Sequence, residues 1–271
     1  MGASGSHLAV FAPVGGAGRV DAVVRRLSDA IALGLLADGE QLPSEAELAA
    51  RLGVSTVTLR EALMALRQQG LVETRRGRGG GSFVRTPQEP PELGERLRAF
   101  TVDELRDLGD HYAAIAGAAA RLAALRALPG DVAPLQRTLD AMTRAASEGA
   151  RPHTGPEGAR PHGVGDGGGG LGAEVRAVLR RLDGRFHIEV AAASQSARLT
   201  QEEIRLQADI GPLLWLPYDE PGGHDEATAQ HRAIAEAIRR GDPGQARDLA
   251  EQHVLDAIER LIELRLRLAD A

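Results

Sequence analysis

The 271-residue chain has no cysteine, no lysine and few aromatic residues, which make up 3% of it. The absence of cysteine excludes disulfides, thiol catalysis and thiolate metal sites, so any metal ion must be held by histidine, aspartate or glutamate. With so few aromatic side chains, a core must be built mostly from leucine, alanine, valine and isoleucine. All 32 basic residues are arginines, which we attribute to compositional bias of the genome.

Long apolar runs are also missing from the sequence. No stretch of about eighteen apolar residues occurs, and no charged and apolar leader opens the chain. We therefore expect a cytoplasmic protein without a membrane segment. The length is sufficient for two domains of ordinary size, each with its own core.

The net charge of −6 is unevenly distributed along the chain. Ten arginines and eight acidic residues lie between Arg19 and Arg85, so this segment carries a positive excess and the remainder is acidic. Three of these arginines, Arg75, Arg76 and Arg78, lie within four residues. Because clustered positive charge attracts phosphate groups, this segment is the candidate for contact with nucleic acid.

Composition and periodicity predict a mainly α fold in four parts. These are a disordered N-terminus (1–18), a winged helix-turn-helix domain (19–86), a proline-containing linker (87–98) and an all-helical antiparallel bundle (99–271). Within the bundle, a repeat of EGARPH and a glycine run predict a flexible insert over residues 147–171. Helical patterns cover residues 105–127, 132–146, 172–194, 199–210, 225–240 and 243–269.

The segment before the linker predicts three helices followed by a hairpin. An apolar stripe marks the first helix over 19–36, and Ser44 with Glu47 forms a capping box for the second. Gly53 supplies a tight turn, and Ser55 caps a third helix that ends at Gly70. Residues 72–75 and 82–85 then pair around the tip RGRGGG.

This arrangement suits the grooves of a DNA duplex. The first turn of a recognition helix enters the major groove, where small hydroxyl side chains reach phosphates or base edges and an arginine pairs with guanine or phosphate. A glycine-rich tip that carries arginines can enter the narrow minor groove. The alternative is a helix-turn-helix used only for protein contact, with its arginines solvated. The predicted DNA-binding residues are Ser55, Thr56, Thr58, Arg60, Arg75, Arg76, Gly77 and Arg78.

The sequence PSEAELAARLGVSTVTLREALMALRQQGLVETRRGRGGGSFV resembles the winged-helix domain of the GntR family of bacterial transcription regulators. The resemblance runs without a gap from about Val20 to Val84 and implies operator contacts from the third helix and from the wing tip. Related proteins often carry a DNA-contacting arginine in the second helix, where this chain has Ala46.

Four residues in the second half predict a metal site. Asp183 and His187 are spaced i, i+4 and therefore share one helix face. His231 and His253 each fall within an apolar helical stripe, so both are expected to point into the bundle. Imidazole nitrogens and a carboxylate suit a divalent ion, with zinc as the first choice and nickel or manganese as alternatives. His111 and His224 are rival ligands.

These residues and their spacing resemble the FCD effector domain of the FadR subgroup, over about residues 100–265. The resemblance implies a metal that helps hold a small carboxylate effector, whose binding shifts the DNA-binding domains. Family members often carry an arginine in the first bundle helix. One alignment puts Tyr112 and Ala116 at that arginine and its companion glutamate, and another offers Arg106 and Asp110, so Arg106 and Tyr112 are both candidate effector-binding residues.

The leading hypothesis is a homodimeric, ligand-responsive transcription regulator, a repressor by default, that binds a palindromic DNA operator. A second hypothesis is a metal-dependent enzyme fused to a DNA-binding domain, since such a metal site can leave positions open for water. A third keeps the regulator and makes the metal structural, or makes the metal itself the effector.

Overall fold

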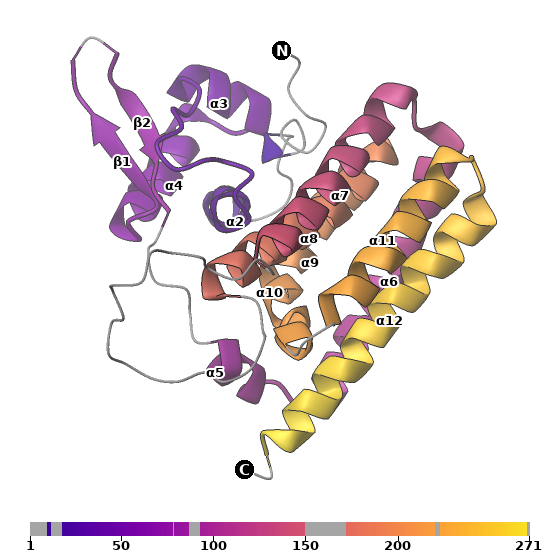
Figure 1. The fold of residues 1–271 in the computed structure, drawn as a ribbon. Coiled ribbons are helices and arrows are strands. Elements are labelled where there is room, and N and C mark those ends of the chain that lie inside the picture. The colour runs from indigo at the N-terminus through magenta and orange to yellow at the C-terminus, as the bar shows by residue number, and fades with distance from the viewer. Residues whose placement is uncertain are drawn as a thin grey trace, which may run out of the picture.

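The structure is a computed structural model that describes residues 10–11, 18–77, 79–86, 93–149, 172–219 and 223–269. The N-terminal part contains helices and one hairpin, and the remainder is helical (Figure 1). The mainly α fold class is confirmed. The predicted insert lies outside the described residues except for 147–149, as do Arg78 and residues 87–92 of the predicted linker.

The region predicted to bind DNA, residues 19–86 and called the DNA-binding region below, forms from local signals that the sequence carries. Ser44 and Ser55 cap the second and third helices, each accepting a hydrogen bond from a backbone N–H three residues later. Between these helices Gly53 has a φ of 67°, a left-handed conformation that favours glycine. The elements are α2 (Arg19–Ala32), α3 (Glu45–Leu52), α4 (Thr56–Gln68), β1 (Val72–Arg75) and β2 (Gly81–Val84). The antiparallel register pairs Val72 with Val84 and Arg75 with Gly81.

The core of this region extends beyond the predicted domain on both sides. Val10 and Phe11 are buried within it, so the disorder expected for residues 1–18 does not extend to them. Two residues of the helical part, Ile188 and Ile204, also belong to this core. The DNA-binding region is therefore packed against its neighbour by apolar contacts.

The helical part is built on two long helices that pack along each other, α6 (Val102–Arg126) and α12 (Pro243–Arg267). Their approach is close, because a Cβ atom at Gly109 would lie 2.9 Å from Ile258 Cγ2. Asp242 caps α12 as predicted, accepting a hydrogen bond from the Gln245 N–H at 3.0 Å. The other elements are α5 (Leu93–Arg98), α7 (Pro129–Gly149), α8 (Ala173–Ala193), α9 (Ala197–Asp209), α10 (Gly211–Leu214), η1 (Leu216–Asp219) and α11 (Gly223–Arg239).

Helix α5 occupies the second half of the predicted linker. Its Leu97 is fully buried in the core of the helical part, and Arg96 donates a hydrogen bond to the Asp209 carbonyl at 2.8 Å. The apolar contact of Leu97 explains why this segment is helical and packed rather than a spacer. Among the described helices, none combines the length and the apolar composition of a membrane span.

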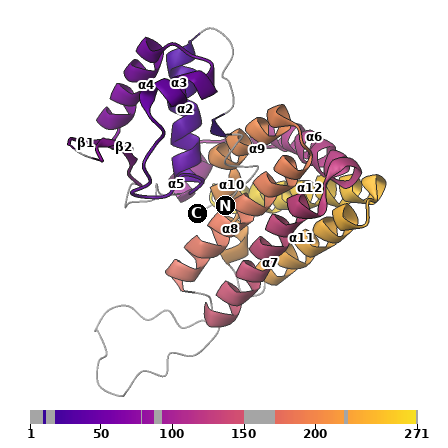
Figure 2. The same ribbon diagram turned by 90° about the horizontal axis from the view of Figure 1, so that it is seen from above.

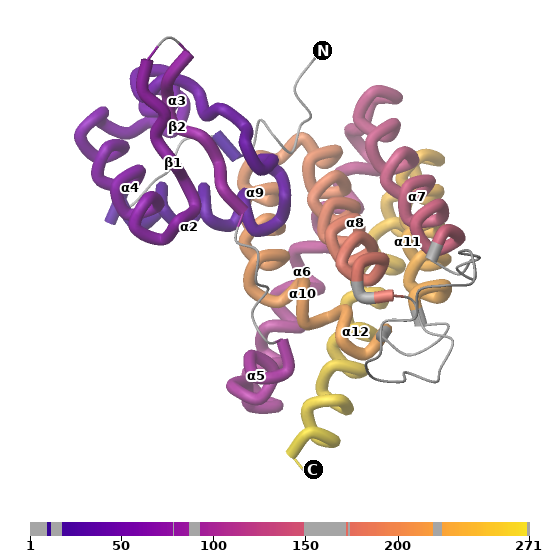
Figure 3. The backbone as a smooth tube through the Cα atoms, turned by 60° about the vertical axis from the view of Figure 1, so that its left-hand side comes forward, coloured from indigo at the N-terminus to yellow at the C-terminus, as the bar shows by residue number. Residues whose placement is uncertain are grey.

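Helix α9 lies between the DNA-binding region and the rest of the bundle (Figures 2 and 3). It contacts α2 on one side and α8 and α6 on the other. Across the contact with α2, the Arg26 side chain donates a hydrogen bond to Gln201 Oε1 at 3.1 Å. Ile204 of α9 adds the apolar part of the same contact.

Candidate functional site

The first turn of α4 presents the predicted DNA-reading residues at the surface. Thr56 and Arg60 are exposed, and Ser55 and Thr58 are linked by a hydrogen bond of 2.8 Å between their hydroxyl oxygens. The Arg60 Nε atom lies 2.7 Å from Glu45 Oε2. Because both side chains of this ion pair are largely exposed, the pair is weak and phosphate or guanine can replace the glutamate.

The hairpin presents the predicted wing residues. The Arg75 guanidinium lies 4.2 Å from the centre of the Phe83 ring and pairs with Glu73 at 2.8 Å. Arg76 and Gly77 are exposed at the tip. The turn is tight at Gly80, where a Cβ atom would lie 2.5 Å from the Arg75 carbonyl oxygen. The glycines of the tip therefore allow a backbone course that other residues would obstruct.

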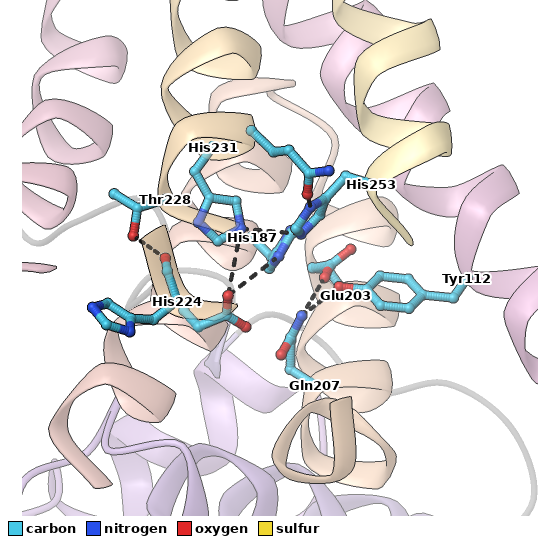
Figure 4. A network of polar contacts seen from close by, with 10 residues as sticks. Tyr112, His187, Glu203, Gln207, His224, Thr228, His231 and His253 are labelled. Carbon is cyan, nitrogen blue, oxygen red and sulfur yellow. Dashed lines mark hydrogen bonds and ion pairs between the residues drawn. The ribbon is translucent and has the colours of Figure 1, made fainter. Parts of the chain in front are cut away.

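The second site is a buried cluster in the helical part. Asp183 and His187 come from α8, His231 from α11 and His253 from α12, and one ligand atom from each lies within 4.8 Å of the others. His231 Nε2 lies 3.1 Å from His253 Nε2 and 3.4 Å from Asp183 Oδ1. Figure 4 shows the three imidazoles turned toward one another. The structure therefore brings together all four predicted ligands.

Burial controls the protonation of this cluster. It raises the pKa of Asp183 to about 7, opposed by a hydrogen bond from Trp215. Burial also holds the pKa values of His187 and His231 well below their usual range and lowers that of His253 to about 4. The imidazoles are therefore neutral at neutral pH and can offer lone pairs.

The imidazoles of His231 and His253 do not satisfy all of their nitrogen atoms by hydrogen bonds within the protein. His253 Nδ1 lies 2.7 Å from Gln230 Oε1, which can only accept, so this nitrogen carries the proton and Nε2 has its lone pair free. His231 Nδ1 is buried without a hydrogen-bond partner. If that nitrogen carries the proton of His231, two lone pairs face each other across 3.1 Å. In that tautomer both Nε2 lone pairs can bind one divalent ion, so the donor set fits a metal. With the proton on Nε2 instead, His231 donates to His253 or Asp183 without an ion.

The rival histidines lie outside the cluster. His111 is exposed and pairs with Glu202 at 3.0 Å, while His224 lies 3.3 Å from Asp225. Arg106 is also not brought to the site: it is exposed and pairs with Asp103 at 3.1 Å, so the structure gives no support to an effector role for it.

Tyr112 does lie beside the cluster, with its ring centroid 6.2 Å from that of His187. Its hydroxyl hydrogen-bonds to Gln207, whose side-chain amide also donates to Glu203 Oε1 at 3.1 Å. Burial raises the pKa of Glu203 to about 7. The i, i+4 spacing of Glu203 and Gln207 on α9 was the only signal in the sequence, and it is common on solvated helix faces.

A small cavity of about 10 Å³ adjoins the cluster, with room for about one water molecule. Tyr112 and Asp183 line it together with Trp215 and Tyr218. A larger molecule can enter only if these side chains move. Trp215 and Tyr218 lie on short elements, α10 with its following residue and η1, whose positions no sequence pattern indicated.

Comparison with known proteins identifies a protein family for the N-terminal region and another for the helical part. Residues 19–81 match the bacterial regulatory proteins of the gntR family, and residues 169–256 match the FCD domain. The chain is 40% identical over 257 residues to a Mycobacterium gastri protein that carries the name HTH-type transcriptional regulator RmpR, covering 93% of this chain and 84% of that protein.

Two relatives from Escherichia coli strain K12 are also similar. One carries the name L-lactate dehydrogenase operon regulatory protein and is 30% identical over 248 residues, covering 85% of this chain and 84% of that protein. The other is named Glc operon transcriptional activator and is 27% identical over 241 residues, covering 86% of this chain and 85% of that protein.

These relatives are named as regulators rather than enzymes, so the hypothesis of a metal-dependent enzyme is not supported. The helix-turn-helix domain implies binding to DNA, and the FCD domain implies a small-molecule effector. The chain belongs to the GntR family of bacterial transcription regulators and carries an FCD effector domain.

Proposed function

We propose that this regulator binds a short palindromic operator as a homodimer and that a divalent ion at Asp183, His187, His231 and His253 helps to bind a small carboxylate effector. The observation that carries the metal part is the convergence of three neutral imidazoles and one carboxylate in a buried cluster. Zinc is the first candidate, and nickel or manganese would also accept these ligands.

A carboxylate effector fits the chemistry of this site. The ion would supply positive charge that a carboxylate can ligate. Tyr112, Glu203 and Gln207 offer hydrogen-bonding groups beside the cluster, suited to the polar part of a small acid. One relative is named for an operon of L-lactate dehydrogenase, whose substrate is itself a carboxylate. Because the cavity is small, effector binding would displace side chains such as Trp215 and Tyr218.

On each of two helices, a residue at the cluster is followed directly by a residue buried in the core of the DNA-binding region. On α8, His187 belongs to the cluster and the next residue, Ile188, is buried in the DNA-binding core. On α9, Glu203 belongs to the polar network at the cluster and the next residue, Ile204, is buried in that same core. A shift of either helix on effector binding would therefore move the contact with α2, which supports coupling between effector and operator affinity.

The dimer and the palindrome follow from the size of the reading surface. One winged helix reads only a few base pairs, so two copies related by a two-fold axis are needed for useful specificity. We propose that the protein represses transcription, because a protein bound over a promoter excludes polymerase. We also propose that it acts in the cytoplasm. One relative is named as an activator, so expression of the adjacent genes must decide the direction.

The test is selection of genomic fragments by the purified protein, followed by fluorescence anisotropy of the best fragment at fixed salt. We expect a palindromic site bound by two chains, with affinity that falls steeply as salt rises because phosphate contacts release counterions. Substitution of one half-site should abolish tight binding. Enrichment no greater than for random DNA would contradict the proposal, provided that circular dichroism shows folded protein.

A further inference from the structure

Two large apolar side chains are exposed on the recognition helix. Val57 is 61% exposed and Met64 is 53% exposed, and their i, i+7 spacing places both on the same side of α4. The opposite side carries Leu59, Leu63 and Leu66, all buried in the core. Val57 and Met64 therefore face away from the protein.

Single exposed apolar residues are common on protein surfaces and need no function. Val57 differs because of its position in the first turn of α4, between Thr56 and Thr58 and one turn before Arg60. A β-branched residue at an exposed helix position gains no packing and is a weaker helix former than alanine or leucine. Neither helix formation nor packing of the described residues accounts for valine at this position.

We propose that Val57 reads a thymine by contact with its C5 methyl group in the major groove. This inference rests on the proposed operator binding and adds a base preference to it. Among the four bases only thymine presents a methyl group in the major groove, and apolar side chains contact it there. The first turn of a recognition helix is the part that meets base edges, and Val57 is the exposed apolar residue of that turn.

The neighbouring residues support contact with base edges rather than with another protein. Ser55 and Thr58 are engaged in the helix cap, and their hydroxyls remain at the surface to meet phosphates. Arg60 lies three residues after Val57 on the same helix and is 67% exposed. Arginine and an apolar residue at this spacing would read a guanine and a nearby thymine.

The experiment replaces single thymidines of the selected operator by deoxyuridine, which removes only the C5 methyl group. At one thymine in each half-site, we expect this replacement to weaken binding of the wild-type protein by roughly fourfold, the equivalent of ~0.8 kcal/mol for one buried methyl-sized group. Val57→Ala should bind the thymidine operator more weakly by a similar or larger factor and should no longer respond to the replacement.

Met64→Ala is the matched control. Met64 is similarly exposed on the same side of α4 but lies about 10 Å further along the helix, beyond the first turn. This variant should retain the full response to deoxyuridine. Because both positions are exposed, neither substitution should change the melting temperature appreciably.

The outcomes separate this inference from the proposed function. If the wild-type protein binds its operator tightly but no deoxyuridine replacement weakens it, Val57 does not read a methyl group. The same conclusion follows if Val57→Ala responds like wild type. If no operator is found at all, operator binding itself fails, and the assignment of Val57 is overturned with it.

Discussion

The proposed DNA-reading face and the proposed metal cluster place their residues in opposite environments. On the reading face, Arg60 and Arg75 are exposed and already paired with Glu45 and Glu73. In the cluster, the side chains are buried, and His231 Nδ1 has no hydrogen-bond partner. A ligand on the exposed face should therefore change stability little, whereas an ion bound among the buried side chains of the cluster should stabilise the fold.

This difference separates two kinds of substitution. Exposed ion pairs contribute little to the free energy of unfolding, because water replaces each partner. Buried polar groups without partners cost more, because they have lost their hydration. We therefore expect changes on the reading face to alter operator affinity alone, and changes in the cluster to alter stability as well.

The largest effect is expected for His231→Ala, which removes a ligand at the centre of the cluster. Wild-type protein should gain ~4.1 kcal/mol of unfolding free energy at a metal concentration about 1,000 times the dissociation constant. The variant should lose most of this gain, measured by denaturant unfolding with and without chelator. His224→Ala is the control, since His224 lies nearby but outside the cluster. Equal stabilisation of wild type and His231→Ala would contradict the site.

The next effect concerns the contact between the two regions. Ile204→Ala should lower the unfolding free energy of the DNA-binding region by about 2–4 kcal/mol, because a buried isoleucine is truncated within its core. Leu125→Ala, at an exposed position of α6, should change it by less than about 0.5 kcal/mol. Calorimetry of both variants measures the difference. No change in Ile204→Ala would show that the α2–α9 contact is absent in solution.

Arg60→Ala tests the reading face. Loss of a bidentate contact to guanine should weaken operator binding by about 1–3 kcal/mol at fixed salt, while the unfolding free energy stays nearly unchanged. Glu45→Gln should act in the opposite direction, because it releases Arg60 from its ion pair. An unchanged dissociation constant for Arg60→Ala would remove this arginine from the reading surface.

The smallest expected effect is that of pH on the apparent affinity for the metal ion. In the metal-free protein the pKa of Asp183 is raised to about 7, so below this pH a proton competes with the metal for the carboxylate. Apparent metal affinity should fall by up to about tenfold, or ~1.4 kcal/mol, for each pH unit below 7 and level off above it. The pKa of His253, lowered to about 4, means that this imidazole adds no competition near neutral pH.

Competition titrations with a chromophoric chelator at several pH values measure this slope. Asp183→Asn is the control, because its amide does not titrate and the slope attributed to Asp183 should disappear. A flat profile for the wild-type protein would show that Asp183 is already ionised or is not a ligand.

The features that the sequence predicts well are local. Ser44 and Ser55 cap helices because each lies just before a helical pattern, and Asp183 and His187 share a face because of helix geometry. The inward direction of His231 and His253 follows from apolar stripes. Each of these depends on residues only a few positions apart.

The remaining features depend on contacts between distant segments. The burial of Leu97 and Phe11 arises from tertiary packing, which local composition does not reveal. The same holds for the contact of Tyr112 with Gln207 and for the ion pair of Arg60 with Glu45. The structure gives no support to the expectation for Arg106, which came from a shifted alignment of the first bundle helix, since this side chain is exposed and pairs with Asp103.

The central claim is that Asp183, His187, His231 and His253 bind a divalent ion. The most direct test is the metal content of the purified protein, measured by mass spectrometry after dialysis against a buffer that contains trace zinc. Wild-type protein should retain about one divalent ion per chain through the four ligands of the cluster. His231→Ala and His253→Ala should retain far less, and His224→Ala should match wild type. Retention that is equal in wild type and in both ligand variants would contradict a metal centre at this position.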